Sequence, residues 1–145
     1  MNHPNKVSAY APATIANLGP GFDVLGLAVE SPGDIVHVWI EEEGPPGVRI
    51  REIRGTQELP YDVSLNTAGV AATRVLEGSG KNLSLSLILE KGMPLGSGMG
   101  SSGASAAAAA FATNQLLGTP LGQLELLGAA REGERIACGS PHADN

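Results

Sequence analysis

The clearest alternation of hydrophobic and polar residues in the chain runs from Leu83 to Glu90. Leucine stands at every second position, with serine, isoleucine and glutamate between, which predicts a strand with one buried face. Residues 35–40 and 48–53 are rich in β-branched residues and are separated by Gly-Pro-Pro-Gly at 44–47, so we expect a hairpin. Two further strands are expected nearer the N-terminus, over residues 7–17, where Pro12 indicates an edge or a bulge, and over residues 23–29.

Helical patterns dominate the second half of the chain. Residues 64–77 place apolar side chains at helical spacing and are followed by Gly78 as a stop signal. Residues 101–117 predict a second helix after a glycine-rich loop. A third is expected from Thr119-Pro120, as N-cap and first helical residue, to about Ala137. Strands first, then strands alternating with helices, indicate an α+β domain.

Composition narrows the classes of function. The 145 residues carry a formal net charge of -6 and their basic residues form no cluster, which argues against a nucleic-acid partner. The single cysteine, Cys138, cannot form an internal disulfide, which favours a reducing compartment and hence the cytoplasm. The first ten residues lack a signal-peptide run, and the longest apolar stretch, 106–112, is too short to cross a bilayer, so no membrane partner is expected.

Glycines gather in two segments, residues 19–26 and 92–103, and the second lies between a predicted strand and a predicted helix. Glycine at 96, 98, 100 and 103 lets backbone N–H groups point into one concavity. The start of the following helix adds unpaired donors and the positive end of its dipole. This combination predicts a phosphate-binding loop.

The glycine-rich loop also admits other interpretations. A turn without a ligand is the simplest. Gly98-x-Gly100-x-x-Gly103 fits a dinucleotide fingerprint, but residues 121–127, where a second strand should follow, predict a helix. Residues 100–104 also resemble a nucleophile elbow, with His142 and Asp144 as partners, yet an elbow needs no glycines ahead of it. The loop contains no Gly-Lys-Ser/Thr and is therefore not a Walker loop.

Three segments carry a family resemblance. Residues 94–104, Pro-Leu-Gly-Ser-Gly-Met-Gly-Ser-Ser-Gly-Ala, closely resemble the phosphate-binding motif of GHMP kinases, from which Met99 and Gly103 depart mildly. Residues 11–26 resemble the opening motif of the homoserine kinases within that superfamily, almost residue for residue. Residues 140–145 resemble their His-x-Asp-Asn segment. The loop alone would admit mevalonate, galactose or other GHMP kinases, whereas the three segments in this order favour a homoserine kinase.

The resemblance implies a fold and an activity. Residues 1–145 would form the N-terminal, ATP-binding domain, truncated at its C-terminal end, with the ribosomal protein S5 domain 2-like fold: a mixed sheet with helices packed on it. The activity implied is ATP-dependent phosphorylation of the side-chain hydroxyl of L-homoserine to O-phospho-L-homoserine, in threonine biosynthesis. Another GHMP small-molecule kinase, or a nucleotide-binding fragment without catalytic activity, stays open. ADP release with and without homoserine would separate these.

The resemblance also assigns nucleotide and metal ligands. Ser102 and Glu134 would hold Mg²⁺, and the choice of Glu134 over Glu132 rests on its register in the helix. Asn66 and Lys91 fall where the family lines the adenine pocket, although Asn66 is equally suited to a helix cap and Lys91 to a solvated strand end. The full predicted ATP-binding set is Pro94, Leu95, Gly96, Ser97, Gly98, Met99, Gly100, Ser101, Ser102, Gly103, Ala104, Asn66 and Lys91.

Substrate ligands follow from the other two segments. Asp23 can pair with the homoserine ammonium, and we place it with Ser102 and Glu134 in the catalytic set. Asn17 and Asn145 can orient the hydroxyl or amino group, and His142 lies in the same motif. For Asn17 and Asp23 the alternative is a hydrogen-bonded turn.

No general base is identified, and no arginine lies in a recognisable motif for the substrate carboxylate. We expect that anchor in sequence beyond Asn145. Residues 1–145 alone are therefore expected to be inactive and marginally stable. The resemblance implies a homodimer for the full-length protein.

Overall fold

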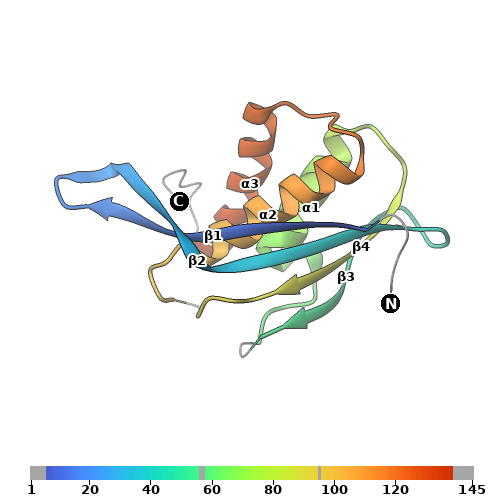
Figure 1. Ribbon diagram of the computed structural model, residues 1–145. Helices are drawn as coiled ribbons and strands as arrows, with labels where there is room; N and C mark the ends of the chain where they lie inside the picture. The colour runs from blue at the N-terminus through green and yellow to red at the C-terminus, as the bar shows by residue number, and fades with distance from the viewer. Residues whose placement is uncertain (1–5, 56–57, 95, 139–145) are drawn as a thin grey trace.

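A single mixed sheet organises the chain. The computed structural model describes residues 6–55, 58–94 and 96–138. The strands are β1 (Val7–Leu18), β2 (Gly21–Glu41), β3 (Gly47–Arg54) and β4 (Ser84–Glu90), in the spatial order β1-β2-β4-β3. β1 with β2 and β2 with β4 are antiparallel, whereas β3 with β4 is parallel. The mixed sheet and the α+β class agree with the sequence prediction (Figure 1).

The predicted hairpin between residues 35–40 and 48–53 is wrong, because β4 lies between β2 and β3. Val48 and Ile50 are buried and pair with the leucine-rich β4 in parallel register. A parallel neighbour requires a long crossover, which the helix between β3 and β4 supplies. Burial of the most apolar strand at the centre of the sheet therefore outweighed the local turn signal.

β2 is also longer than predicted. The segments expected as separate strands, 23–29 and 35–40, belong to one strand that pairs with β1 along most of its length. Residues 14–28 continue beyond the helices as a two-stranded arm (Figure 1). The arm exposes apolar side chains, namely Ile15, Leu18, Leu25 and Leu27.

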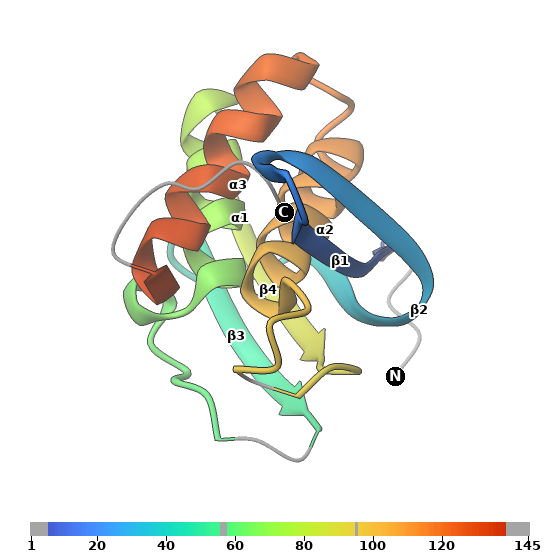
Figure 2. The ribbon, with the colours of Figure 1, turned by 90° about the vertical axis from the view of Figure 1, so that its left-hand side faces the viewer.

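Three helices cover one face of the sheet in the described part of the chain (Figures 1 and 2). After a short 3-10 turn, η1 (Val63–Leu65), come α1 (Thr67–Gly78), α2 (Ser101–Leu116) and α3 (Gln123–Cys138). α2 contacts both other helices as well as β1 and β2. Alanine is its commonest residue, which lets it pack close to the sheet. The core is formed by its buried alanines with Val36, Val38, Val75, Leu85, Leu87 and Leu89.

The start of α3 was predicted wrongly. Thr119 has φ 59° and does not cap a helix, and α3 begins at Gln123. The Asn114 side chain, at the end of α2, instead holds Leu121 through its backbone N–H and C=O, each at 3.0 Å. The Glu125 carboxylate then accepts the Gly122 N–H at 2.8 Å, so an acidic side chain from the first turn satisfies a donor ahead of the helix.

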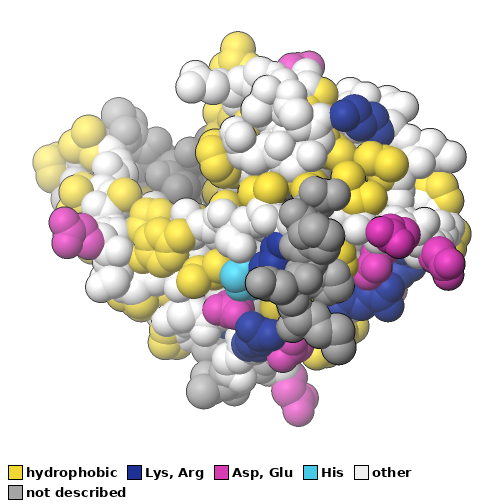
Figure 3. Space-filling model, turned by 45° about the vertical axis from the view of Figure 1, so that its right-hand side comes forward, with side chains coloured by type: hydrophobic (Ala, Val, Ile, Leu, Met, Phe, Trp, Pro, Cys, Tyr) yellow, Lys and Arg dark blue, Asp and Glu magenta, His cyan; other side chains and the backbone are white. Residues whose placement is uncertain are grey.

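The sheet face away from the helices is polar and rich in ion pairs. Figure 3 shows a histidine there with acidic and basic side chains around it. The pairs are His37–Glu90 at 3.2 Å, Arg51–Glu41 at 3.2 Å, Arg54–Glu52 at 2.8 Å, and Arg54–Glu90. Within residues 6–55, 58–94 and 96–138, no helix has both the length and the hydrophobicity needed to span a bilayer.

Candidate active site

The glycine-rich loop connects the end of β4 to the start of α2 (Figure 2). Gly96, Gly98 and Gly100 have φ values of 67°, 73° and 65°, in the left-handed region that side chains disfavour. A Cβ at Gly96 or Gly98 would meet no atom within 4 Å. Glycine is therefore required here for backbone conformation and not for lack of space. Left-handed residues of this kind are typical of anion-binding nests, in which successive backbone N–H groups converge.

The N-terminus of α2 faces the same loop. Its N-cap is Gly100, which has no side chain to satisfy the first N–H groups of the helix. Those donors and the helix dipole together favour an anion at this end. The backbone N–H of Thr14 in β1 donates to the Met99 carbonyl at 3.0 Å, which fixes the loop against the sheet. The geometry suits the phosphates predicted from the sequence.

Ser102 and Glu134 lie next to this anion site. The Ser102 hydroxyl donates to Glu134 Oε1 at 2.9 Å, joining the first turn of α2 to α3. Glu134 is 5% exposed. A hydroxyl and a carboxylate are hard oxygen donors, and Mg²⁺ commonly takes only one or two protein oxygens besides phosphates and water. This pair therefore fits the metal that the resemblance implies.

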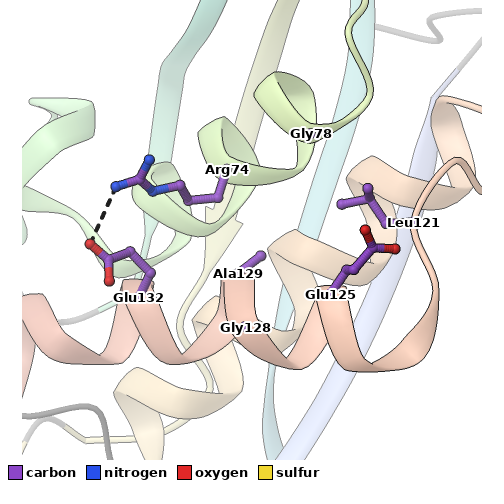
Figure 4. Close-up of a pocket in the computed structure, with 7 residues that line it drawn as sticks. All are labelled: Arg74, Gly78, Leu121, Glu125, Gly128, Ala129 and Glu132. Carbon is purple, nitrogen blue, oxygen red and sulfur yellow. Dashed lines mark hydrogen bonds and ion pairs between the residues drawn. The ribbon is translucent and has the colours of Figure 1, made fainter.

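Glu132 has different neighbours although it lies two residues away on α3. Its carboxylate pairs with Arg74 of α1 at 3.4 Å and with Arg135 at 3.0 Å. Figure 4 shows Glu132 directed toward Arg74, beside a surface pocket of about 330 Å³ between α1 and α3. No described residue of the glycine loop lines this pocket. The sequence could distinguish Glu134 from Glu132 only by register in the helix. In the structure the two carboxylates have different partners, Ser102 for Glu134 and two arginines for Glu132.

Lys91 and Asn66, predicted near the adenine, both have protein partners. The Lys91 side chain is 2% exposed and forms an ion pair with Asp34. Asn66 caps α1, accepting from the N–H groups of Ala68 at 3.1 Å and Gly69 at 3.3 Å. Their contact with a nucleotide stays a prediction.

Two of the four predicted substrate ligands lie outside the described part of the structure. His142 and Asn145 lie outside it, as do Asp144 and Leu95 of the predicted ATP-binding set. Asn17 and Asp23 belong to β1 and β2, close to the turn that joins them in the arm, but their side chains are not described. Their grouping around a substrate stays a prediction.

Sequence reasoning missed Asp34 and Ser105, which are 0% and 1% exposed. A signal for Asp34 existed, because alternation along β2 places it on the same buried face as Val36 and Val38. A carboxylate on a buried face requires a partner. Ser105 lies in an alanine-rich helix, and nothing in its local pattern sets it apart.

Comparison with known proteins agrees with this geometry. Residues 66–145 match the family model described as the GHMP kinases N terminal domain. The chain belongs to the GHMP kinase family. Its helix α2, its glycine loop and Glu134 all lie within the matched GHMP kinase segment.

Several relatives are homoserine kinases. The homoserine kinase of Chloroherpeton thalassium is 46% identical over 149 residues, covering 97% of this chain and 47% of that protein. That of Methanococcus maripaludis is 43% identical over 142 residues, covering 97% of this chain and 46% of the relative. The crystal structure of homoserine kinase from Cytophaga hutchinsonii superimposes with a TM-score of 0.91 at 46% identity, covering 100% of this chain and 46% of that one. The chain thus spans about half the length of these relatives.

Proposed function

We propose that this chain is the ATP-binding part of a homoserine kinase, which transfers the γ-phosphoryl group of ATP to the side-chain hydroxyl of L-homoserine. The product would be O-phospho-L-homoserine, on the way to threonine. The observation that carries the proposal is the Ser102–Glu134 pair beside a left-handed glycine loop at a helix N-terminus. Identities of 43–46% to homoserine kinases support the choice of substrate among the alcohols that GHMP kinases phosphorylate.

Phosphoryl transfer depends on positioning and charge neutralisation more than on covalent chemistry by the protein. The N–H groups of the loop and of the first turn of α2 would bind the phosphates and fix the direction of transfer. Ser102 and Glu134 would hold Mg²⁺, which when bound supplies positive charge and Lewis acidity at the phosphoryl oxygens. Glu134 is well suited to this position because its burial keeps competing solvent from the carboxylate.

We place the substrate ligands on the arm and at the end of the chain. Asp23 would pair with the homoserine ammonium, while Asn17 and Asn145 would orient the hydroxyl or amino group. His142 would complete this set. If Asp23 holds the ammonium, it is poorly placed to accept the hydroxyl proton, so transfer without a dedicated protein base fits this arrangement.

A direct assay tests the activity. The full-length gene product should release ADP from ATP–Mg²⁺ only when L-homoserine is present, and phosphorus NMR should identify the product as O-phospho-L-homoserine. Mevalonate and galactose serve as competing alcohols. Equal turnover with either of them, or ADP release that ignores homoserine, would assign the chain to another GHMP kinase or to a nucleotide-binding role.

We also propose that the full-length protein works in the cytoplasm as a homodimer. The single cysteine supports the compartment, and the family resemblance supports the assembly. Sedimentation of the full-length gene product would give one dimeric species if this is correct.

A further inference from the structure

A cluster of buried polar side chains lies directly behind the glycine loop. It comprises Asp34 of β2, Lys91 just after β4, and Ser101 and Ser105 of α2, and we call it the Asp34–Lys91 cluster. The β2–β4 pairing ends with Ile35 opposite Glu90, so Asp34 and Lys91 are neighbours at this end of the two strands. The side chains of Lys91 and Asp34 are 2% and 0% exposed.

The Lys91 ammonium is fully engaged by the protein. Besides Asp34, it donates to Ser101 Oγ at 2.6 Å, to Ser105 Oγ at 2.8 Å and to the Ser101 carbonyl at 3.0 Å. An ammonium has three N–H donors, and these acceptors take all of them. A phosphate or an adenine would have to displace one of these buried partners to bind Lys91.

The Asp34 carboxylate binds both ends of the loop. Its Oδ1 accepts the Gly92 N–H at 3.0 Å, where the loop begins. Its Oδ2 accepts the Ser105 hydroxyl at 2.6 Å, in the helix that follows the loop. The cluster therefore fixes the entry of the loop and the first turns of α2 to the same point on β2.

Backbone packing reinforces the entry point. A Cβ at Gly92 would lie 2.0 Å from the Gly33 carbonyl oxygen, and a Cβ at Gly33 would lie 2.5 Å from the Ala11 carbonyl oxygen. Glycine at both positions allows β1, β2 and the start of the loop to approach closely. The loop thus begins against the sheet and cannot move inward.

Stability alone gives a poor account of this ion pair. Burying each charge costs several kcal/mol, and apolar residues of similar volume often replace a buried pair with no loss of stability. A carboxylate bonded to both ends of one loop instead sets the distance and direction between those ends. The N–H groups that would face phosphate lie between them.

We propose that Asp34 and Lys91 are positioning residues, which set the phosphate-binding geometry of the loop without touching the nucleotide. The inference rests on the proposed kinase function and deepens it. It also gives Lys91 a role different from the adenine contact that the family resemblance implies.

The test compares four variants of the full-length gene product. Lys91→Met and Asp34→Asn each break the pair, and Asp34→Leu/Lys91→Met replaces it by an uncharged pair that should fold even where a single variant does not. Ser105→Ala removes one partner of both charges and is the mild variant. The control is Glu41→Gln/Arg51→Met, an exposed pair between β2 and β3 on the other face of the same sheet.

Two measurements are made on each variant. We expect KM for ATP to rise about tenfold or more in both single variants and in the double variant, with KM for homoserine within about twofold. KM for ATP in the double variant should be no higher than in either single variant, because each single substitution already breaks the ion pair that positions the loop. Hydrogen exchange of residues 92–104 without nucleotide should become faster in all four variants, while exchange in α1 stays unchanged. In the control variant, exchange of residues 92–104 should stay at the wild-type rate.

The outcomes separate this proposal from the function it rests on. A large loss of ATP affinity in Lys91→Met with none in Asp34→Asn would show a direct nucleotide contact and overturn the proposal. Wild-type KM and wild-type exchange in the double variant would overturn it as well. Absence of homoserine-dependent turnover in the wild type would overturn the proposed function, and loop exchange without nucleotide would still decide the positioning role.

Discussion

Replacing Glu134 by glutamine tests the metal site with little change of shape. Glu134 is 5% exposed and accepts the Ser102 hydroxyl at 2.9 Å. Glutamine keeps an acceptor for that hydroxyl, so the free energy of unfolding should change by about 1 kcal/mol or less. The negative charge is lost, and with it a charge-assisted interaction worth about 1.5–3 kcal/mol, or roughly 10- to 150-fold in an equilibrium constant.

We therefore expect Glu134→Gln to lower kcat by at least about an order of magnitude and to raise the Mg²⁺ concentration for half-maximal rate. The assay is homoserine-dependent ADP release over a series of Mg²⁺ concentrations at saturating ATP. Ser102→Ala should lower kcat in the same direction. Glu132→Gln is the matched control, because this carboxylate lies on the same helix but pairs with Arg74 and Arg135. Equal effects of the two glutamine variants, or an unchanged Mg²⁺ dependence in Glu134→Gln, would refute the assignment.

Further predictions concern the substrate, the loop, the isolated segment and acid stability. Asp23→Asn should raise KM for homoserine roughly 10- to 150-fold, the value of one charge-assisted bond, while KM for ATP stays near wild type; the reverse pattern would remove Asp23 from the site. Gly98→Ala meets no steric obstacle but strains a residue at φ 73°, so we expect weaker ATP binding by calorimetry. The free energy of unfolding should fall by no more than about 2 kcal/mol. Residues 1–145 expressed alone should show no homoserine-dependent ADP release and should self-associate in sedimentation through the apolar arm; an active monomer would contradict this. The hydrogen bond from Ser86, with Arg51, lowers the pKa of Glu41, so its contribution to stability is present above the ordinary pKa and is lost as pH falls through the lowered one. Ser86→Ala should therefore flatten the fall in Tm between about pH 5 and pH 3, and an unchanged slope would contradict the assignment.

The parts of the fold that sequence predicted well are those set by local pattern. The alternation over residues 83–90 and the glycine loop before an alanine-rich helix depend on neighbours in the chain, and both agree with the structure. The order of strands depends on which strand can bury its apolar face best at the centre of the sheet, a property of the whole sheet, so the turn at 44–47 was misleading. The start of α3 depends on Asn114, a side chain from the preceding helix.

The candidate site divides in the same way. Ser102 follows from the loop motif, and the position of Glu134 opposite it follows from the packing of α3 on α2. Asp34 was missed because its partner Lys91 is 57 residues away in sequence, and only the β2–β4 register brings the two together. Charge pairs of this kind leave no periodic signal, although an acidic residue on a buried strand face is a sign that one exists.

The alanine surface of α2 has a consequence for how this domain tolerates mutation. Ala106, Ala109 and Ala112 are 0% exposed, and α2 packs against the sheet, α1 and α3. Their methyl groups fill the close-packed space between α2 and its neighbours. A larger side chain at one of these positions would therefore shift the helix. The N-terminus of that helix carries Ser102 and the proposed phosphate site. A larger side chain at one of these buried positions should therefore change the proposed nucleotide affinity first, and we expect natural variation at them to be confined to residues as small as alanine, glycine and serine, unlike at the exposed Phe111.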